Sequence, residues 1–195
     1  MIAGVEMRRS IVLLFLMTAG IVAFPLPPLQ AQTALPSGQP DCSSCSSFGV
    51  QRFSDKKEAP FFNLKRVDGT FVNLRDLKGK PALLFFWATY CPSCKEDIPV
   101  FEKFLKGKTD QISIFTFVID GESEKAVQKA IKKHTVGLPV LLDVNERIAR
   151  TYGVKMVPTT YLISREGLML GRVVGQRNWA SSEAWSAVKE LLDLR

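Results

Sequence analysis

The feature that most constrains this chain is an unbroken apolar run, Ala82–Trp87, followed closely by a Cys-x-x-Cys pair, Cys91 and Cys94. A continuous apolar run is typical of a strand that is buried on both faces. Pro92 suits the first turn of a helix, because its missing N–H has no intrahelical partner there. We therefore predict a buried strand, a short loop and a helix over Pro92–Leu105, with Cys91 at the helix start.

The rest of the body predicts an α/β fold with a mixed central sheet flanked by helices. The dipeptide Asp68–Gly69 suits the turn of a β-hairpin between Phe61–Leu64 and Thr70–Leu74, which would be an N-terminal extension of the sheet domain. Further strands are expected at Ile112–Ile119, Val140–Leu142, Thr159–Ile163 and Leu168–Val173, and helices at Ser123–His134, Asn145–Tyr152 and after Ser182.

The amino-terminal region predicts export. Arg8 and Arg9 precede an uncharged run, Ile11–Phe24, which has the pattern of a signal peptide and is short for a membrane span. We interpret residues 1–31 as a signal peptide or an N-terminal membrane anchor. Residues 32–55 show no periodicity and are expected to form a flexible tether, with the folded domain over 56–195. The protein is then periplasmic or otherwise extracytoplasmic, either soluble after cleavage or anchored.

The charge pattern excludes one class of partner. The formal net charge is +7, but basic residues are interspersed with acidic ones, so we expect no nucleic-acid binding. Lys129, Lys132 and Lys133 are interpreted as a solvated helix face. We expect no cofactor, no bound metal and a monomeric protein.

The helical period places the two cysteines of the pair differently. Cys91, at a helix amino terminus, faces unpaired N–H groups and the positive end of the dipole, which favour its thiolate. Cys94 begins the apolar stripe of Ile98, Phe101 and Leu105, so it should be shielded. This arrangement suits thiol-disulfide exchange, in which the first sulfur attacks and the second resolves. A static disulfide or half of a zinc site are the alternatives.

A second pair, Cys42 and Cys45, lies inside the predicted tether. Its disulfide would close too short a loop to stabilise much. Three interpretations stay open: an idle oxidised pair, a redox relay or regulatory partner for Cys91 and Cys94, and a metal-binding element.

Several motifs together resemble the exported thioredoxin-like reductases of the TlpA/ResA type. They are Trp87-Ala-Thr-Tyr-Cys-Pro-Ser-Cys-Lys95, the Asp68–Gly69 hairpin with Leu77–Pro81, and Tyr152–Val154 leading to Val157–Thr160. The resemblance covers about residues 59–194. It implies a thioredoxin fold, a Cys91/Cys94 redox pair, and a cis bond between Val157 and Pro158 that brings this loop beside the cysteines.

The resemblance also implies further site residues. Asp97 matches an acidic position in relatives and could take the proton of Cys94, although Glu96 and Asp97 could instead complement the helix dipole. The expected catalytic groups are therefore Cys91, Cys94, Asp97 and Pro158. The expected substrate contacts are Trp87, Tyr90, Pro92, Ser93, Val157 and Pro158.

The function implied is that of an exported thiol-disulfide oxidoreductase that reduces specific protein disulfides, with electrons from a membrane thiol donor. Family analogy suggests substrates in cytochrome c maturation or copper-centre assembly. The alternatives are a thiol oxidant or isomerase of the same fold, and a non-enzymatic copper chaperone that holds Cu(I) with two soft thiolates.

Overall fold

The computed structural model describes residues 42–77 and 79–194; the predicted signal peptide or anchor and the first part of the predicted tether lie outside them. A mixed six-stranded sheet has the order β1-β8-β7-β4-β5-β6. β5 runs parallel to β4 and β6, and the other neighbouring strands are antiparallel. The strands are β1 (Val50–Glu58), β4 (Ala82–Trp87), β5 (Ser113–Val118), β6 (Val140–Leu142), β7 (Thr159–Ile163) and β8 (Leu168–Val174).

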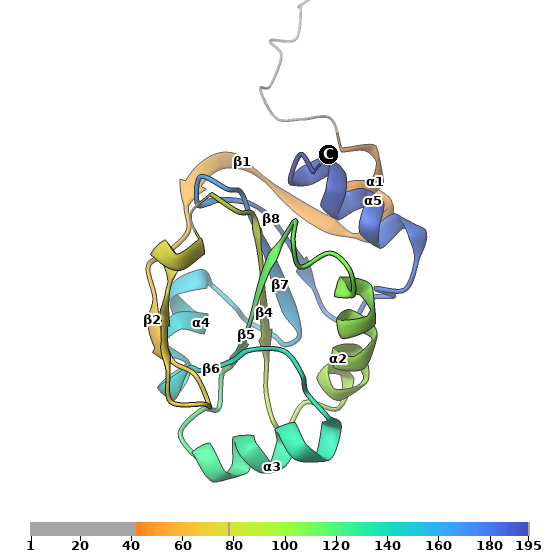
Figure 1. Ribbon diagram of the computed structural model, residues 1–195. Helices are drawn as coiled ribbons and strands as arrows, with labels where there is room; N and C mark the ends of the chain where they lie inside the picture. Colours follow the sequence, from red (N-terminus) through yellow and green to blue (C-terminus); the bar gives the residue numbers. More distant parts are fainter. Residues whose placement is uncertain (1–41, 78, 195) are drawn as a thin grey trace, which may run out of the picture. The chain divides into compact units, whose positions relative to one another are not determined.

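Helices cover both faces of the sheet, with α2 and α4 on opposite sides (Figure 1). The predicted α/β architecture is thus confirmed. In the described ranges, no helix combines the length and apolar character needed to cross a membrane. The helices are α1 (Ser43–Phe48), α2 (Pro92–Leu105), α3 (Glu124–His134), α4 (Arg147–Tyr152) and α5 (Ser182–Leu191), with 3-10 turns η1 (Leu74–Leu77) and η2 (Val144–Glu146).

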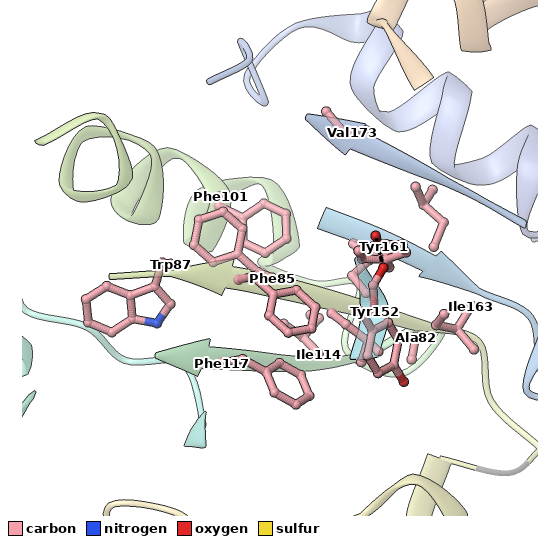
Figure 2. Close-up of a cluster of buried hydrophobic side chains, with 14 of the residues drawn as sticks. Ala82, Phe85, Trp87, Phe101, Ile114, Phe117, Tyr152, Tyr161, Ile163 and Val173 are labelled. Carbon is pink, nitrogen blue, oxygen red and sulfur yellow. Dashed lines mark hydrogen bonds between the residues drawn. The ribbon is translucent and has the colours of Figure 1, made fainter. Parts of the chain in front are cut away.

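The core is built around β4, in which every residue is buried. Because successive side chains of a strand point to opposite faces, Phe85 and Phe86 pack in different layers. Phe85 stacks on Phe101 of α2 with ring centroids 5.0 Å apart (Figure 2). On the other face, the ring centroids of Phe86 and Tyr152 of α4 are 5.5 Å apart. The strand that leads to Cys91 is therefore packed on both faces and gives the following loop a rigid support.

The predicted hairpin forms a separate two-stranded antiparallel sheet of β2 (Asn63–Lys65) and β3 (Phe71–Asn73). Gly69 in its turn has φ 90°, a conformation that glycine adopts without steric cost. The Val67 N–H donates a hydrogen bond to the Val140 carbonyl at 3.1 Å. This bond joins the hairpin to β6 of the main sheet.

The prediction of a flexible tether is wrong for residues 42–55, which form α1 and part of β1. β1 pairs with β8 at the sheet edge, and α1 packs on α5. The Ser44 N–H and hydroxyl donate to the Glu190 carboxylate at 3.1 and 2.8 Å. Burial of Cys45 and Phe48 stabilises this segment. The sequence shows no helical period here because two buried residues are too few to produce one.

Replacing Phe48 by alanine is expected to lower the free energy of unfolding by about 3–4 kcal/mol. Phe48 is 5% exposed and packs edge-on against Trp179 with ring centroids 4.9 Å apart. Urea denaturation would measure the loss. Phe71→Ala is the matched control, because Phe71 is 68% exposed and its loss should change stability by less than about 1 kcal/mol. Similar losses for both variants would show that α1 is not docked.

Candidate active site

The loop after β4 places Cys91 at the N-cap of α2, as predicted. The Cys94 N–H donates to the Cys91 Sγ at 3.1 Å. The two cysteines form a disulfide with Cα atoms 5.3 Å apart, so this is the oxidised protein. After reduction the same N–H and the helix dipole face the Cys91 sulfur, and both favour the thiolate.

The two sulfurs differ in access. Cys91 is 5% exposed, whereas Cys94 has no exposed surface. Ile98, Phe101 and Leu105 are also buried, which confirms the predicted stripe that begins at Cys94. Cys91 is less open than expected from its position at a helix start, so a substrate disulfide has to approach it closely. Any attack from outside reaches Cys91 first.

The loop of Met156, Val157 and Pro158 lies beside the first cysteine, as the resemblance implied. The bond between Val157 and Pro158 is cis. The Val157 carbonyl oxygen lies 3.8 Å from the Cys91 Sγ, and the Thr159 hydroxyl donates to the Met156 carbonyl at 2.8 Å. The backbone of this loop thus forms one wall next to the sulfur.

The other predicted substrate contacts divide into two groups. Tyr90 is 64% exposed, Pro92 is exposed, and the Ser93 hydroxyl lies 3.4 Å from the Cys91 Sγ. Ser93 thus lies next to the sulfur, and Tyr90 and Pro92, which flank Cys91 in the sequence, are open to solvent. Trp87 is only 1% exposed, so we correct its assignment: it supports the loop from the core and cannot touch a substrate directly.

Asp120 is a site residue that the sequence analysis missed. Its carboxylate accepts hydrogen bonds from the Thr89 N–H, at 2.9 Å, and from the Thr89 hydroxyl, and so holds the loop in front of the cysteines. Trp87 of β4 pairs with Val118 of β5, and Thr89 and Asp120 each lie two residues further along. The sequence signal that could have identified Asp120 is its position: it follows the neighbouring parallel strand β5 by the same number of residues as Thr89 follows β4.

Asp97 lies one turn after Cys94 in α2 and is 3% exposed. Burial raises the pKa of its carboxyl to about 6, although hydrogen bonds from the Gln176 side chain and the Arg177 backbone lower it in part. Within the described ranges, the Asp97 Oδ2 has no hydrogen-bond partner. A buried carboxyl that titrates near neutral pH is suited to proton transfer. Its burial argues against the alternative that Asp97 only complements the helix dipole as a surface charge.

The second pair is also a disulfide, with the Cα atoms of Cys42 and Cys45 5.3 Å apart. It lies at the start of α1, against α5 (Figure 1), where the Cys42 Sγ is 3.9 Å from the Ala187 carbonyl oxygen. The two residues are 6% and 2% exposed. Among the described residues, no hydrogen bond or disulfide joins this pair to Cys91 or Cys94, and its redox role stays a prediction.

The site can exchange disulfides with another molecule because Cys91 keeps a small exposed surface, whereas Cys94, which is bonded to it, has none. This chemistry, on a mixed sheet with a cis-proline loop beside the dithiol, defines a thioredoxin-like thiol-disulfide oxidoreductase.

Comparison with known proteins gives the family. The model of the AhpC/TSA family matches residues 56–170. The thiol-disulfide oxidoreductase ResA of Bacillus subtilis is 36% identical over 127 residues, covering 65% of this chain and 71% of the relative. The ResA of Bacillus cereus is 33% identical over 140 residues, covering 68% of this chain and 80% of the relative. The solved pneumococcal exposed lipoprotein thioredoxin of Streptococcus pneumoniae aligns with a TM-score of 0.61 and 31% identity, covering 68% of this chain and 100% of that one.

This chain therefore belongs to the AhpC/TSA family, and within it to the thioredoxin-like proteins of the ResA/TlpA type. The thioredoxin fold implied by the sequence motifs is confirmed.

Proposed function

We propose that the reduced protein reduces disulfides of other proteins in two successive exchanges. The Cys91 thiolate attacks one sulfur of the substrate disulfide, forms a mixed disulfide and expels the other substrate sulfur as a thiolate. Cys94 then attacks the Cys91 Sγ, which closes the Cys91–Cys94 disulfide and releases the second substrate thiolate. Two electrons pass to the substrate. The observation that carries this order of attack is the exposure of 5% at Cys91 against 0% at Cys94.

The reducing direction rests on the resemblance to TlpA/ResA-type reductases, and the equilibrium with glutathione tests it. Trapping the free thiols with an alkylating reagent at a series of glutathione ratios gives the midpoint potential of the Cys91–Cys94 couple. We expect a value below about −200 mV, in the range of thioredoxin and the glutaredoxins. A value near about −120 mV, typical of a strong thiol oxidant, would overturn the reductant proposal and favour the oxidant alternative.

We further propose that Asp97 accepts the proton of the Cys94 thiol and so activates it for the second exchange. The two residues are one helical turn apart, and the Asp97 carboxyl is buried with a pKa raised to about 6. A base with a pKa near the working pH is the most effective one for such a transfer. The Gln176 side chain and the Arg177 backbone would then orient the carboxyl.

Replacing Asp97 by asparagine is expected to stabilise the oxidised protein at neutral pH. The pKa of Asp97 is about 6 in the folded protein against an ordinary 3.8, so the folded state binds more protons between these values. Stability therefore falls as the pH rises from about 4 to about 6, and above pH 6 the buried charge costs about 3 kcal/mol. Asparagine removes this cost. Urea denaturation across this pH range measures the difference.

The same variant separates a catalytic role of Asp97 from a structural one. If Asp97 activates Cys94, the Asp97→Asn variant should form the mixed disulfide at the normal rate but resolve it at least about tenfold more slowly at pH 7. Asp110→Asn is the matched control, because Asp110 is exposed, lies beyond the end of α2 and should change neither quantity. Normal resolution in Asp97→Asn would contradict the proton-transfer role.

We propose that the protein acts outside the cytoplasm and receives electrons from a membrane thiol donor. The signal-like segment of residues 1–31 and the family resemblance support this location. Disulfides of exported cytochrome c and copper-centre proteins are the proposed substrates. Fractionating an exporting bacterial host that expresses the full chain tests the location, and recovery in the cytoplasm alone would overturn it.

A further inference from the structure

A wide groove of about 940 Å³ lies between the solvent face of α3 and the turn of the β2–β3 hairpin, which lie next to each other in Figure 1. Its apolar part consists of Val67, from the hairpin, and Ile131, from α3, both of which are half-buried. Four exposed lysines of one helix face also line it, and we call this surface the lysine groove: Lys125, Lys129, Lys132 and Lys133.

The charge of the lysine groove is not compensated locally. The two acidic residues nearest to it in sequence already have partners: Glu124 pairs with Lys65 at 3.2 Å, and Asp68 pairs with Arg66 at 3.0 Å. None of the four groove lysines forms an ion pair with another residue in the part of the chain that the structure describes.

The spacing of the groove lysines is unfavourable for the helix itself. Lys125, Lys129 and Lys133 follow one another at i, i+4, where like charges destabilise a helix, and the helix dipole offsets this only for Lys132 and Lys133 in the last turn of α3. The sequence analysis interpreted these lysines as a solvated helix face. Solvation alone does not explain why a row of positive charges lies beside a groove that contains apolar side chains. An anionic group bound between the lysines would offset their mutual repulsion.

We propose that the lysine groove docks an acidic segment of a partner protein, with an apolar side chain of that segment against Val67 and Ile131. A membrane surface fits less well, because both apolar residues are half-buried and the groove offers no large exposed side chain for insertion. The large exposed apolar side chains of the described residues lie outside this groove: Phe61, Phe71, Tyr90, Val144 and Met156.

Docking there is separate from the exchange reaction. The groove contains no atom of Cys91, Cys94 or the cis-proline loop. One of its walls, the hairpin, is joined to β6 by the hydrogen bond from the Val67 N–H, and to α3 by the Lys65–Glu124 ion pair. Both walls are therefore held in place before a partner arrives, which lowers the entropic cost of binding.

Fluorescence anisotropy with the full-length protein tests this proposal. The probe is a labelled synthetic peptide that carries glutamates on one helical face and leucines at i and i+4 beside them. We expect binding at low salt that is lost at about 0.5 M salt, where charges are screened over a few ångströms. A peptide with glutamine in place of every glutamate should not bind.

Two charge-reversal variants locate the binding. Lys129→Glu with Lys132→Glu should weaken peptide binding at least about tenfold. The control is Lys106→Glu with Lys189→Glu, which changes the net charge equally at exposed lysines outside the groove and should bind normally. Both variants should remain folded and keep the wild-type rate with a small aromatic disulfide, since neither alters the Cys91 site.

Three results would overturn the proposal. They are no binding of the acidic peptide at low salt, equal weakening by the two double variants, and equal binding of the glutamate and glutamine peptides. Vesicles with anionic lipid are the competing ligand. If Lys129→Glu with Lys132→Glu abolishes vesicle binding while the peptide does not bind, the groove recognises a membrane surface instead.

Discussion

Replacing Cys91 by serine is expected to abolish disulfide exchange, with a loss of at least about a thousandfold in the rate of insulin reduction. The hydroxyl of serine is not ionised at neutral pH and cannot attack a disulfide as a thiolate does. Cys94 cannot substitute for it, because Cys94 has no exposed surface and lies behind the first sulfur. Exchange retained in Cys91→Ser would contradict the proposed order of attack.

The second cysteine pair supplies the control for this experiment. Replacing Cys42 and Cys45 together by alanine should leave the exchange rate within about twofold of the wild type, since sites without shared contacts act independently. The Cys42 sulfur lies against α5, 3.9 Å from the Ala187 carbonyl oxygen, and not beside the Cys91–Cys94 disulfide. A large loss of exchange in this double variant, in a protein with normal melting behaviour, would assign the pair a relay role.

Replacing Cys94 by serine is expected to convert the enzyme into a trap for its substrates. Cys91 can still attack, but no second thiol then breaks the mixed disulfide, so the covalent complex should persist until an external thiol is added. In the exporting host, non-reducing electrophoresis should show high-molecular-weight species that dithiothreitol removes. Mass spectrometry of these species should find substrate peptides linked to Cys91.

The trap also tests the asymmetry of the two sulfurs. The reverse variant, Cys91→Ser with Cys94 retained, should form no such complexes, because the sulfur of Cys94 is fully buried. Serine is close in size to cysteine, so neither variant should disturb the packing of Ile98 and Phe101 around the pair. Complexes of similar abundance in both variants would refute the assignment of roles.

Most of the fold could be predicted because its elements have strong local patterns. The bounds of β4, α2, β6 and β7 agree with the predictions, since each is either a continuous buried run or a helix with a clear apolar stripe. Pro92 marks the start of α2, and Pro158 directly precedes β7. The first two elements, α1 and β1, could not be predicted. β1 pairs with a single neighbour at the sheet edge, and α1 has only six residues, too few to be stable without its contacts with α5.

The candidate site divides in the same way. The proposed roles of Cys91 and Cys94 follow from a strand, a helix start and a helical period, all within one short segment. The roles of Asp120, Gln176 and Arg177 depend on distant parts of the chain that meet this segment only after folding.

The sequence alone determined the strand-loop-helix unit, the proposed redox pair and which of its two cysteines is shielded, because residues close in sequence decide these properties. Only the tertiary structure decided that Trp87 is out of reach of a substrate, that Asp97 carries a raised pKa, and that residues 42–55 belong to the folded domain. These properties depend on burial and on pairing between distant segments, and both arise only when the chain has closed around its core.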